Sequence, residues 1–212
     1  MKQKSLFLAA LLLLAEIPAV AQVSIGAGYV NSADRVKTSN TETQVNNANG
    51  FYGGLGFTLP IAGDLSVTPG VYYTYLTSGT ANSVGGGILS WAGTTKEHYI
   101  NVPVRLEYGA EILPNFRLFF FGGPTFSAGL ASKTTLTGSV LGFSANTVID
   151  NYKDTDNYGR YDILLGGGMG VDLAKRIRVT AGYDFGMLNR YTNSDNIVRH
   201  RNQLHAGVAL LF

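Results

Sequence analysis

The sequence has 212 residues, enough for one domain or at most two. It contains 27 glycines and no cysteine, and 14% of its residues are charged, against about 25% in an average soluble protein. The high aromatic content, 11%, argues against a disordered chain. The lack of thiols excludes disulfides and cysteine-based metal or redox sites. A formal net charge of +2 gives no concentrated basic face for nucleic acid.

The start of the chain has the features of a secretory signal peptide. Two lysines precede an uninterrupted apolar run over 6–15, and residues 19–21 (Ala-Val-Ala) have the small–x–small pattern of a cleavage site. The apolar run is too short to span a bilayer, and no later run approaches the roughly 18 residues that a transmembrane helix needs. We therefore predict a signal peptide at 1–21 and a mature domain at 22–212.

The mature sequence alternates apolar and polar residues with the period of a β-strand rather than a helix. The clearest case is 177–187, where odd positions are apolar and even positions are small or charged, so that opposite faces differ in character. Eight segments fit this pattern, most of them near the roughly 9–11 residues that a tilted strand needs to cross a bilayer. They cover 23–29, 51–61, 65–75, 98–112, 116–130, 161–173, 177–187 and 204–212.

Short and long connections alternate between these segments. Tight turns are expected at 62–64, 113–115 and 174–175, whereas the other connections are long and polar. This arrangement is typical of bacterial outer-membrane barrels. We therefore predict an all-β fold, an eight-stranded antiparallel up-and-down transmembrane β-barrel in the outer membrane of a Gram-negative bacterium. The termini and short turns would face the periplasm and the long loops the outside of the cell. These long connections cover 31–49, 77–96, 131–158 and 190–201.

Two kinds of eight-stranded barrel are compatible with this alternation. A soluble, lipocalin-like barrel turns its apolar face inward around a ligand, whereas a membrane barrel turns it toward lipid and keeps a polar interior. The polar face of these strands is mostly Gly, Ser and Thr with sparse charges, which suits a narrow lumen. Tyr and Phe gather near the strand ends, as in the aromatic girdles at membrane interfaces. The sequence therefore favours the membrane barrel.

Several charged residues fall on the polar, inward face by parity. Pairing of neighbouring strands about their turns would place Glu111 opposite Arg117 and Asp172 opposite Arg178. Because a charge inside a barrel must be paired to offset its desolvation, we predict a structural ion network that plugs the lumen instead of an open pore. A proton or ion path through it is the alternative. The predicted members are Arg105, Glu107, Glu111, Arg117, Asp162, Asp172, Arg178, Asp184 and His205.

Four stretches carry a resemblance to a known family. They are residues 98–108 (HYINVPVRLEY), residues 121–124 (FGGP), the glycine-rich segments over 161–189, and the ending 201–212. In these the sequence resembles the PorT-like outer-membrane β-barrel family of Gram-negative bacteria, over nearly all of the mature chain. The resemblance implies insertion by the outer-membrane assembly machinery. One branch of the family takes part in protein secretion, and no residue here places the chain in that branch.

The last predicted strand has the pattern of a C-terminal assembly signal of outer-membrane proteins. His205, Gly207, Leu210 and Phe212 supply its polar residue, glycine, apolar residue and terminal aromatic. We therefore expect recognition by the assembly machinery during biogenesis.

The last long connection is basic, with Arg190, Arg199 and Arg201. Arginine binds phosphate through a bidentate fork, so we expect these residues to contact lipopolysaccharide at the outer leaflet; solvated loop charge is the alternative. The expected partners are thus outer-membrane lipids and lipopolysaccharide, with no nucleic acid, and the sequence does not identify an extracellular partner.

No pattern predicts a catalytic, cofactor or metal site. Outer-membrane lipid A deacylases carry a Ser-His-Glu arrangement on the lipid-facing wall, in which a neighbouring base activates the serine. Here His98 faces outward by parity, but the strand serines face inward. A loop cluster near 194–200 has no spacing rationale, and the segment starting at Asp154 resembles an EF-hand loop without its closing glutamate. The inward serines are Ser24, Ser66 and Ser127.

These observations predict an integral outer-membrane protein that is not an enzyme and needs no cofactor. Its expected role is structural or adhesive, with the long loops as the interaction surface. The alternatives are a small-solute channel and a lipid A-modifying enzyme.

Overall fold

The computed structural model describes residues 21–38, 41–84, 89–140, 143–154, 159–190 and 197–212. The predicted signal peptide, apart from Ala21, lies outside these residues and stays a prediction. None of the described residues forms a helix with the length and apolar character needed to cross a membrane.

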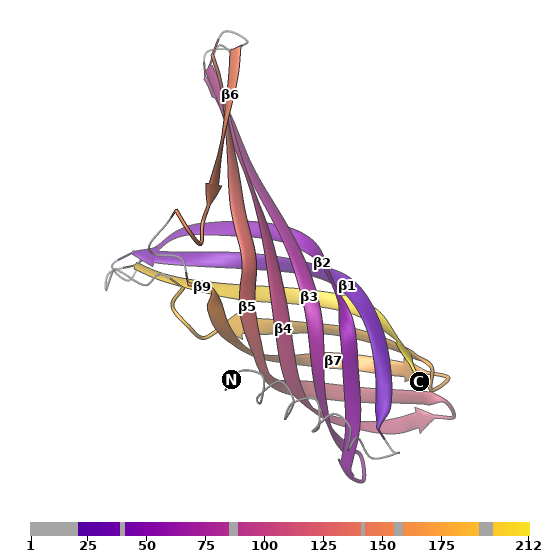
Figure 1. The fold of residues 1–212 in the computed structure, drawn as a ribbon. Coiled ribbons are helices and arrows are strands. Elements are labelled where there is room, and N and C mark those ends of the chain that lie inside the picture. Colours follow the sequence, from indigo (N-terminus) through magenta and orange to yellow (C-terminus); the bar gives the residue numbers. More distant parts are fainter. Residues whose placement is uncertain (1–20, 39–40, 85–88, 141–142, 155–158, 191–196) are drawn as a thin grey trace, which may run out of the picture.

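Nine antiparallel strands make up the described part of the chain (Figure 1). Eight of them close into a ring in the order β1-β2-β3-β4-β5-β7-β8-β9, with β9 paired to β1; the ninth, β6, pairs with β5 outside the ring. The predicted eight-stranded up-and-down barrel is confirmed. The bounds are β1 (Gln22–Thr38), β2 (Thr41–Ala62), β3 (Leu65–Val84), β4 (Leu89–Leu113), β5 (Phe116–Val140), β6 (Phe143–Asp150), β7 (Tyr161–Leu173), β8 (Ile177–Gly186) and β9 (Ile197–Leu211).

The two ends of the barrel differ as the connection lengths predict. At one end, called here the turn end, tight turns join β2 to β3, β4 to β5 and β7 to β8. Gly63, Asn115, Ala174 and Lys175 have positive φ there, the backbone conformation that compact hairpin turns require. The opposite end, called the loop end, carries the long connections.

Much of what the sequence predicts as long polar loops is strand. β4 and β5 each run for 25 residues, and β3, β4, β5 and β6 project together beyond the barrel wall at the loop end (Figure 1). We call this projection the blade and define it as 78–84, 89–96, 132–140 and 143–150. These segments are rich in Thr, Ser, Asn and Gly and lack alternation because neither face lies against a core, so the sequence pattern missed them.

The apolar face of the strands points away from the barrel axis. Phe51 is 56% exposed and Val208 is 59% exposed, whereas charged residues at inward positions such as Arg178 and Asp184 are about 5% and 4% exposed. The predicted orientation, apolar outward and polar inward, is therefore confirmed. Some apolar residues depart from it, among them Phe119 of β5, Leu76 of β3 and Leu164 of β7, which are fully buried.

Candidate functional site

The inward charges of the barrel form three layers stacked from the turn end to the loop end. All of them come from β1, β4, β5, β7, β8 and β9 and from the segment after β8. The sequence of β3, and that of β2 from 45 to 62, contains no charged residue, so these two strands line the lumen with hydroxyl, aromatic and glycine residues. The lumen wall is therefore charged on one side and neutral on the other.

The turn-end layer is a four-membered ion network. Arg178 donates from Nε to Oδ1 of Asp172 at 2.7 Å and from Nη2 to Oδ2 at 3.0 Å, and its Nη1 donates to Oε1 of Glu107 at 3.1 Å. Arg117 Nη1 lies 3.2 Å from Oδ2 of the same aspartate. Both guanidinium groups lie over the ring of Phe119, at 4.5 and 5.2 Å from its centroid. Two cations and two carboxylates thus balance within a layer in which all but Arg117 are buried.

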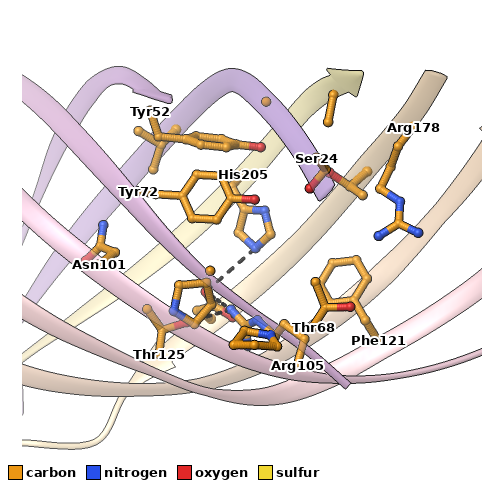
Figure 2. A pocket seen from close by; sticks show the side chains of 18 of the residues that line it. Ser24, Tyr52, Thr68, Tyr72, Asn101, Arg105, Phe121, Thr125, Arg178 and His205 are labelled. Carbon is orange, nitrogen blue, oxygen red and sulfur yellow. Dashed lines mark hydrogen bonds and ion pairs between the residues drawn. The ribbon is translucent and has the colours of Figure 1, made fainter. Parts of the chain in front are cut away.

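The middle layer centres on Arg105 of β4 (Figure 2). Its Nη2 lies 2.8 and 2.7 Å from the two carboxylate oxygens of Asp184 and 2.8 Å from Thr125 Oγ1. His205 Nε2 lies 3.6 Å from Asp184 Oδ2. Nη1 of the arginine donates to the carbonyl of Gly123, whose φ of 150° is a conformation that favours glycine. The groups of this layer come from β4, β5, β8 and β9, so their contacts connect four strands across the lumen.

The loop-end layer contains three arginines around Tyr99. Arg190 donates to Tyr99 Oη at 2.8 Å, and that hydroxyl donates to Glu97 Oε1 at 2.9 Å. Arg201 Cζ lies 4.2 Å from the Tyr99 ring centroid, and its Nη2 donates to Ser127 Oγ at 2.8 Å. The remaining contacts pair Arg190 and Arg199 with Asp34 and Arg201 with Asp162.

Tyr152, in the turn that follows β6, directs its ring toward this layer from the loop end. The guanidinium of Arg160 lies 4.8 Å from its ring centroid. Burial raises the pKa of the Tyr152 phenol above its usual range, so this hydroxyl stays protonated at neutral pH. A Cβ on Gly129 would lie 1.8 Å from its oxygen, so glycine is required beneath it.

Two cavities separate or flank the layers. A cavity of about 150 Å³ lies in the lumen, lined among others by Tyr52, Tyr72, Phe121 and His205 (Figure 2). A second, of about 330 Å³, opens at the turn end beside Arg117. The first has room for a few water molecules.

Several predicted site residues lie on the inner face of the barrel, as the alternation predicts. One of the two ion pairs predicted from strand pairing about the tight turns is also present. Asp172 and Arg178 are register partners and share two hydrogen bonds. Glu111 and Arg117 are also register partners, but the predicted ion pair between them is absent from the described residues, and Glu111 is not a member of the lumen network. Its exposed carboxylate accepts a hydrogen bond from the Asn115 backbone at 2.8 Å, while Arg117 reaches inward to Asp172, so Glu111 lies outside the network of described ion pairs.

The prediction that Arg190 and Arg201 contact lipopolysaccharide is wrong. They are 1% and 0% exposed, because both side chains turn into the lumen toward buried carboxylates. Arg199 is partly exposed and bonds Asp34. In the sequence, a basic connection suggests charges exposed to solvent. In the structure, acidic residues from strands distant in the chain pair with these arginines.

Sequence reasoning missed Asp34, Glu97 and Tyr99 as lumen residues. The signal was available: extending the alternation of 23–29 and 98–112 by a few residues gives all three inward parity. The lumen-facing aromatics Phe119 and Phe121 were also missed, since the interior was expected to hold small residues.

The residues weighed for catalysis do not come together in the described structure. His98 faces outward and its Nδ1 lies 2.5 Å from Tyr73 Oη, while Ser24, Ser66 and Ser127 are buried in the lumen. Asp154 accepts a hydrogen bond from the Asp150 backbone at 2.8 Å. Residues 155–158 and 191–196, which include Asp156, Ser194 and Asp195, lie outside the described residues. Within the described ranges, no three His, Asp or Glu side chains are grouped as metal ligands would be.

The proposed C-terminal assembly signal lies on β9 beside β1. Leu210 and Phe212 face outward, and His205 faces the lumen. A Cβ on Gly207 would lie 2.2 Å from Tyr52 Oη, so this glycine makes room for a lumen side chain. Phe212 also exchanges backbone hydrogen bonds with Val23 at 2.8 and 3.3 Å, which joins the two ends of the barrel domain.

Comparison with known proteins identifies the family. The chain is similar to Ail of Yersinia pestis (15% identity, 91% of this chain and 99% of that chain, TM-score 0.42). It is also similar to Neisserial surface protein A, NspA (17% identity, 90% and 97%, TM-score 0.44). No curated protein matches the sequence significantly. The family model described as outer membrane protein beta-barrel domain matches residues 19–209, and the chain belongs to this outer-membrane β-barrel family.

Proposed function

We propose that this outer-membrane protein is a structural or adhesive barrel with a closed lumen, and that the blade is its interaction surface. The proposal rests on one contrast within the molecule. The interior is filled by paired charges, whereas the projection at the loop end is long, regularly paired and exposed on its faces (Figure 1).

The burial of the inward charges supports a closed lumen. A water-filled pore would leave lumen-facing arginines and carboxylates accessible to water, as in porins. Here Arg105, Asp172 and Arg201 are all less than 9% exposed, one in each layer. The three layers therefore obstruct the path from one end of the barrel to the other.

The blade supports an interaction role. Apolar side chains stand on it without cover from any described residue; Phe143 is 85% exposed and Val148 is 61% exposed. Its outermost strand, β6, pairs only with β5, so one backbone edge is free among the described strands. An open strand edge flanked by exposed apolar side chains is a surface that an extended segment of another protein can join by backbone hydrogen bonding.

We further propose that the turn end and both termini face the periplasm and the blade faces the outside of the cell. What supports this is the asymmetry of connection lengths, since outer-membrane barrels have short periplasmic turns and long extracellular loops. Labelling of a cysteine introduced at exposed Phe143 by an impermeant reagent on intact cells tests it; labelling only after the outer membrane is opened would refute it.

We also infer that the chain is a PorT-like member of the family. Two of the motifs behind this resemblance are neighbours in the structure: 98–108 lies on β4 and 121–124 on β5, and Arg105 of the first bonds the Gly123 carbonyl of the second. An alignment of PorT-like sequences that lacks both residues at these positions would contradict the inference.

The main proposal is tested by separating the barrel from the blade. The register allows Gly79 to be joined to Thr94, and Thr134 to Ile149, through Asn-Gly turns that remove most of the blade. We expect the truncated protein to insert and to keep its heat-modifiable gel mobility, while cells expressing it lose the surface adhesion that the intact protein confers. Unchanged adhesion would refute the role of the blade.

Two further measurements distinguish the alternatives. Intact protein in planar bilayers is expected to give no steady conductance, and large steady currents would favour a small-solute channel. Expression is expected to leave the mass spectrum of lipid A unchanged, and a new acylation state would favour a lipid-modifying enzyme.

A further inference from the structure

Two lysines face each other on the outer wall where the barrel meets the blade. The register pairs Lys96 of β4 with Lys133 of β5. Their chain neighbours Glu97 and Ser132 are buried and point into the lumen, so alternation directs both lysines outward, where both are exposed. Like charges directly opposite each other on one sheet face are destabilising, so this arrangement calls for a counter-charge.

One described carboxylate, that of Asp150, shares this face, and it can balance only one of the two lysines. Neither lysine has an ion pair within 4.0 Å among the described residues. Glu97 accepts a hydrogen bond from Tyr99 on the inner face. Asp150, the register partner of Lys133, accepts a hydrogen bond from the Tyr152 backbone at 3.1 Å and lies 4.0 Å from Lys153. The patch formed by the two lysines and Asp150 therefore keeps a net positive charge toward whatever surrounds the barrel.

The position of the pair along the wall indicates what surrounds it. One outward step below the lysines, roughly 7 Å along the strand, lie Tyr75 and His98, and Tyr73 lies one further step below and completes an aromatic cluster. The His98 and Tyr75 rings are 5.2 Å apart, and Tyr73 Oη is 2.5 Å from His98 Nδ1. Aromatic side chains of this kind mark the headgroup level of a membrane, with the apolar band of the barrel below them. The two ammonium groups therefore lie at the height of lipid phosphates.

Besides Asp150, two further polar groups near the pair can take part in hydrogen bonds with an anion. His98 is one of them, and its Nδ1 shares a hydrogen bond with the Tyr73 hydroxyl in which the donor depends on the tautomer of the ring. Thr77 of β3, the register partner of Lys96, also faces outward because its neighbour Leu76 is buried. Two ammonium groups, one hydroxyl and one imidazole ring thus surround one patch of wall.

We propose that Lys96 and Lys133 bind the phosphate of an outer-leaflet lipid, with Thr77 and His98 as accessory donors. A phosphate between the two ammonium groups converts their repulsion into two attractions and satisfies the site. The ligand class is a phosphorylated lipid headgroup such as that of lipid A, and the site replaces the buried arginines that sequence reasoning had chosen. This inference rests on the outer-membrane location of the barrel and is independent of the role of the blade.

Binding to purified protein in a neutral maltoside detergent tests the site. The probes are lipid A with both phosphates, dephosphorylated lipid A, and inorganic phosphate, measured by native mass spectrometry. The variant K96Q/K133Q is compared with K175N/R176Q, which removes the same charge at the turn end. We expect the first variant to bind lipid A about 25-fold more weakly, because each lysine near an anionic surface contributes about fivefold, and the control to bind like the parent protein.

Each result decides the proposal. Equal binding by K96Q/K133Q, or equal binding of dephosphorylated lipid A, would overturn it. Displacement of lipid A by millimolar inorganic phosphate would show a free-anion site and overturn the lipid assignment.

Thermal stability with and without lipid A provides a second test, because a surface that binds no lipid would give the same effect of the substitution in both conditions. Without anionic lipid, Lys96→Gln removes the repulsion and is expected to raise the temperature at which the folded gel band is lost. With lipid A present, the same substitution is expected to lower that temperature. The absence of this sign change would refute the site.

Discussion

The turn-end layer makes a quantitative prediction, because removal of one charge leaves a countable imbalance. Asp172 is the shared acceptor of Arg178 and Arg117, with contacts of 2.7, 3.0 and 3.2 Å. Asp172→Asn would leave two guanidinium groups, that of Arg178 buried and that of Arg117 partly exposed, facing the single carboxylate of Glu107. Breaking a buried ion pair from one side costs about 3–5 kcal/mol, because an unpaired charge remains out of water. We therefore expect the free energy of unfolding to fall by about that amount.

The assay is reversible urea unfolding of the protein in lipid vesicles, followed by the folded gel band. Asp64→Asn, at an exposed position in a turn-end loop, is the matched control and should change stability by less than about 0.5 kcal/mol. The double variant D172L/R178M restores charge balance and should recover about 2 kcal/mol or more of the loss. A loss below about 1 kcal/mol for Asp172→Asn, or no recovery in the double variant, would refute the view that pairing is what makes these buried charges tolerable.

Three further predictions concern other parts of the lumen. Tyr99→Phe removes the hydroxyl that accepts from Arg190 and donates to Glu97, and should lower stability by about 1–3 kcal/mol in the same urea assay; no change would show that the bridge contributes nothing. Gly207→Ala would bring a methyl group within 2.2 Å of Tyr52 Oη and 2.7 Å of a backbone carbonyl, and should cost about 1–3 kcal/mol and reduce the yield of heat-modifiable protein, against an unchanged yield if the lumen can adjust. Arg201→Ala should lower stability by about 3–5 kcal/mol yet leave lipid A binding unaltered, and weaker lipid binding by the folded variant would contradict its burial.

The barrel itself could be predicted from the sequence because closure imposes two different environments on each strand. Residues such as Ile177, Val179 and Phe185 must meet the outside, and Arg178 and Asp184 the inside, so a period of two is written into the segment. The same parity places Asp172 opposite Arg178 once the tight turn is located.

What the sequence did not reveal lies where this constraint ends. Neither face of the blade packs on a core, and Trp91 there is half exposed. Strands in the blade therefore show no apolar–polar alternation, and the sequence pattern predicts loops for them. The inward turn of Arg190 and Arg201 depends on Asp34, Glu97 and Asp162, which are close to them only after the ring has closed. Pairings of this kind are properties of the closed barrel and have no local pattern.

The uneven distribution of charge around the lumen wall has a consequence for biogenesis. Strand β2 from 45 onward and strand β3 contain no Asp, Glu, Lys, Arg or His, and the one acid of this hairpin, Asp64, lies in its turn, so both strands can traverse hydrocarbon without moving an ion. The opposite half of the wall cannot do so strand by strand, because Asp184 of β8 is neutralised by Arg105 of β4 and Asp172 of β7 by Arg117 of β5. We expect that half to enter the bilayer as a sheet whose ion pairs have already formed. The uncharged strands β2 and β3 would then adjust their position as the barrel closes.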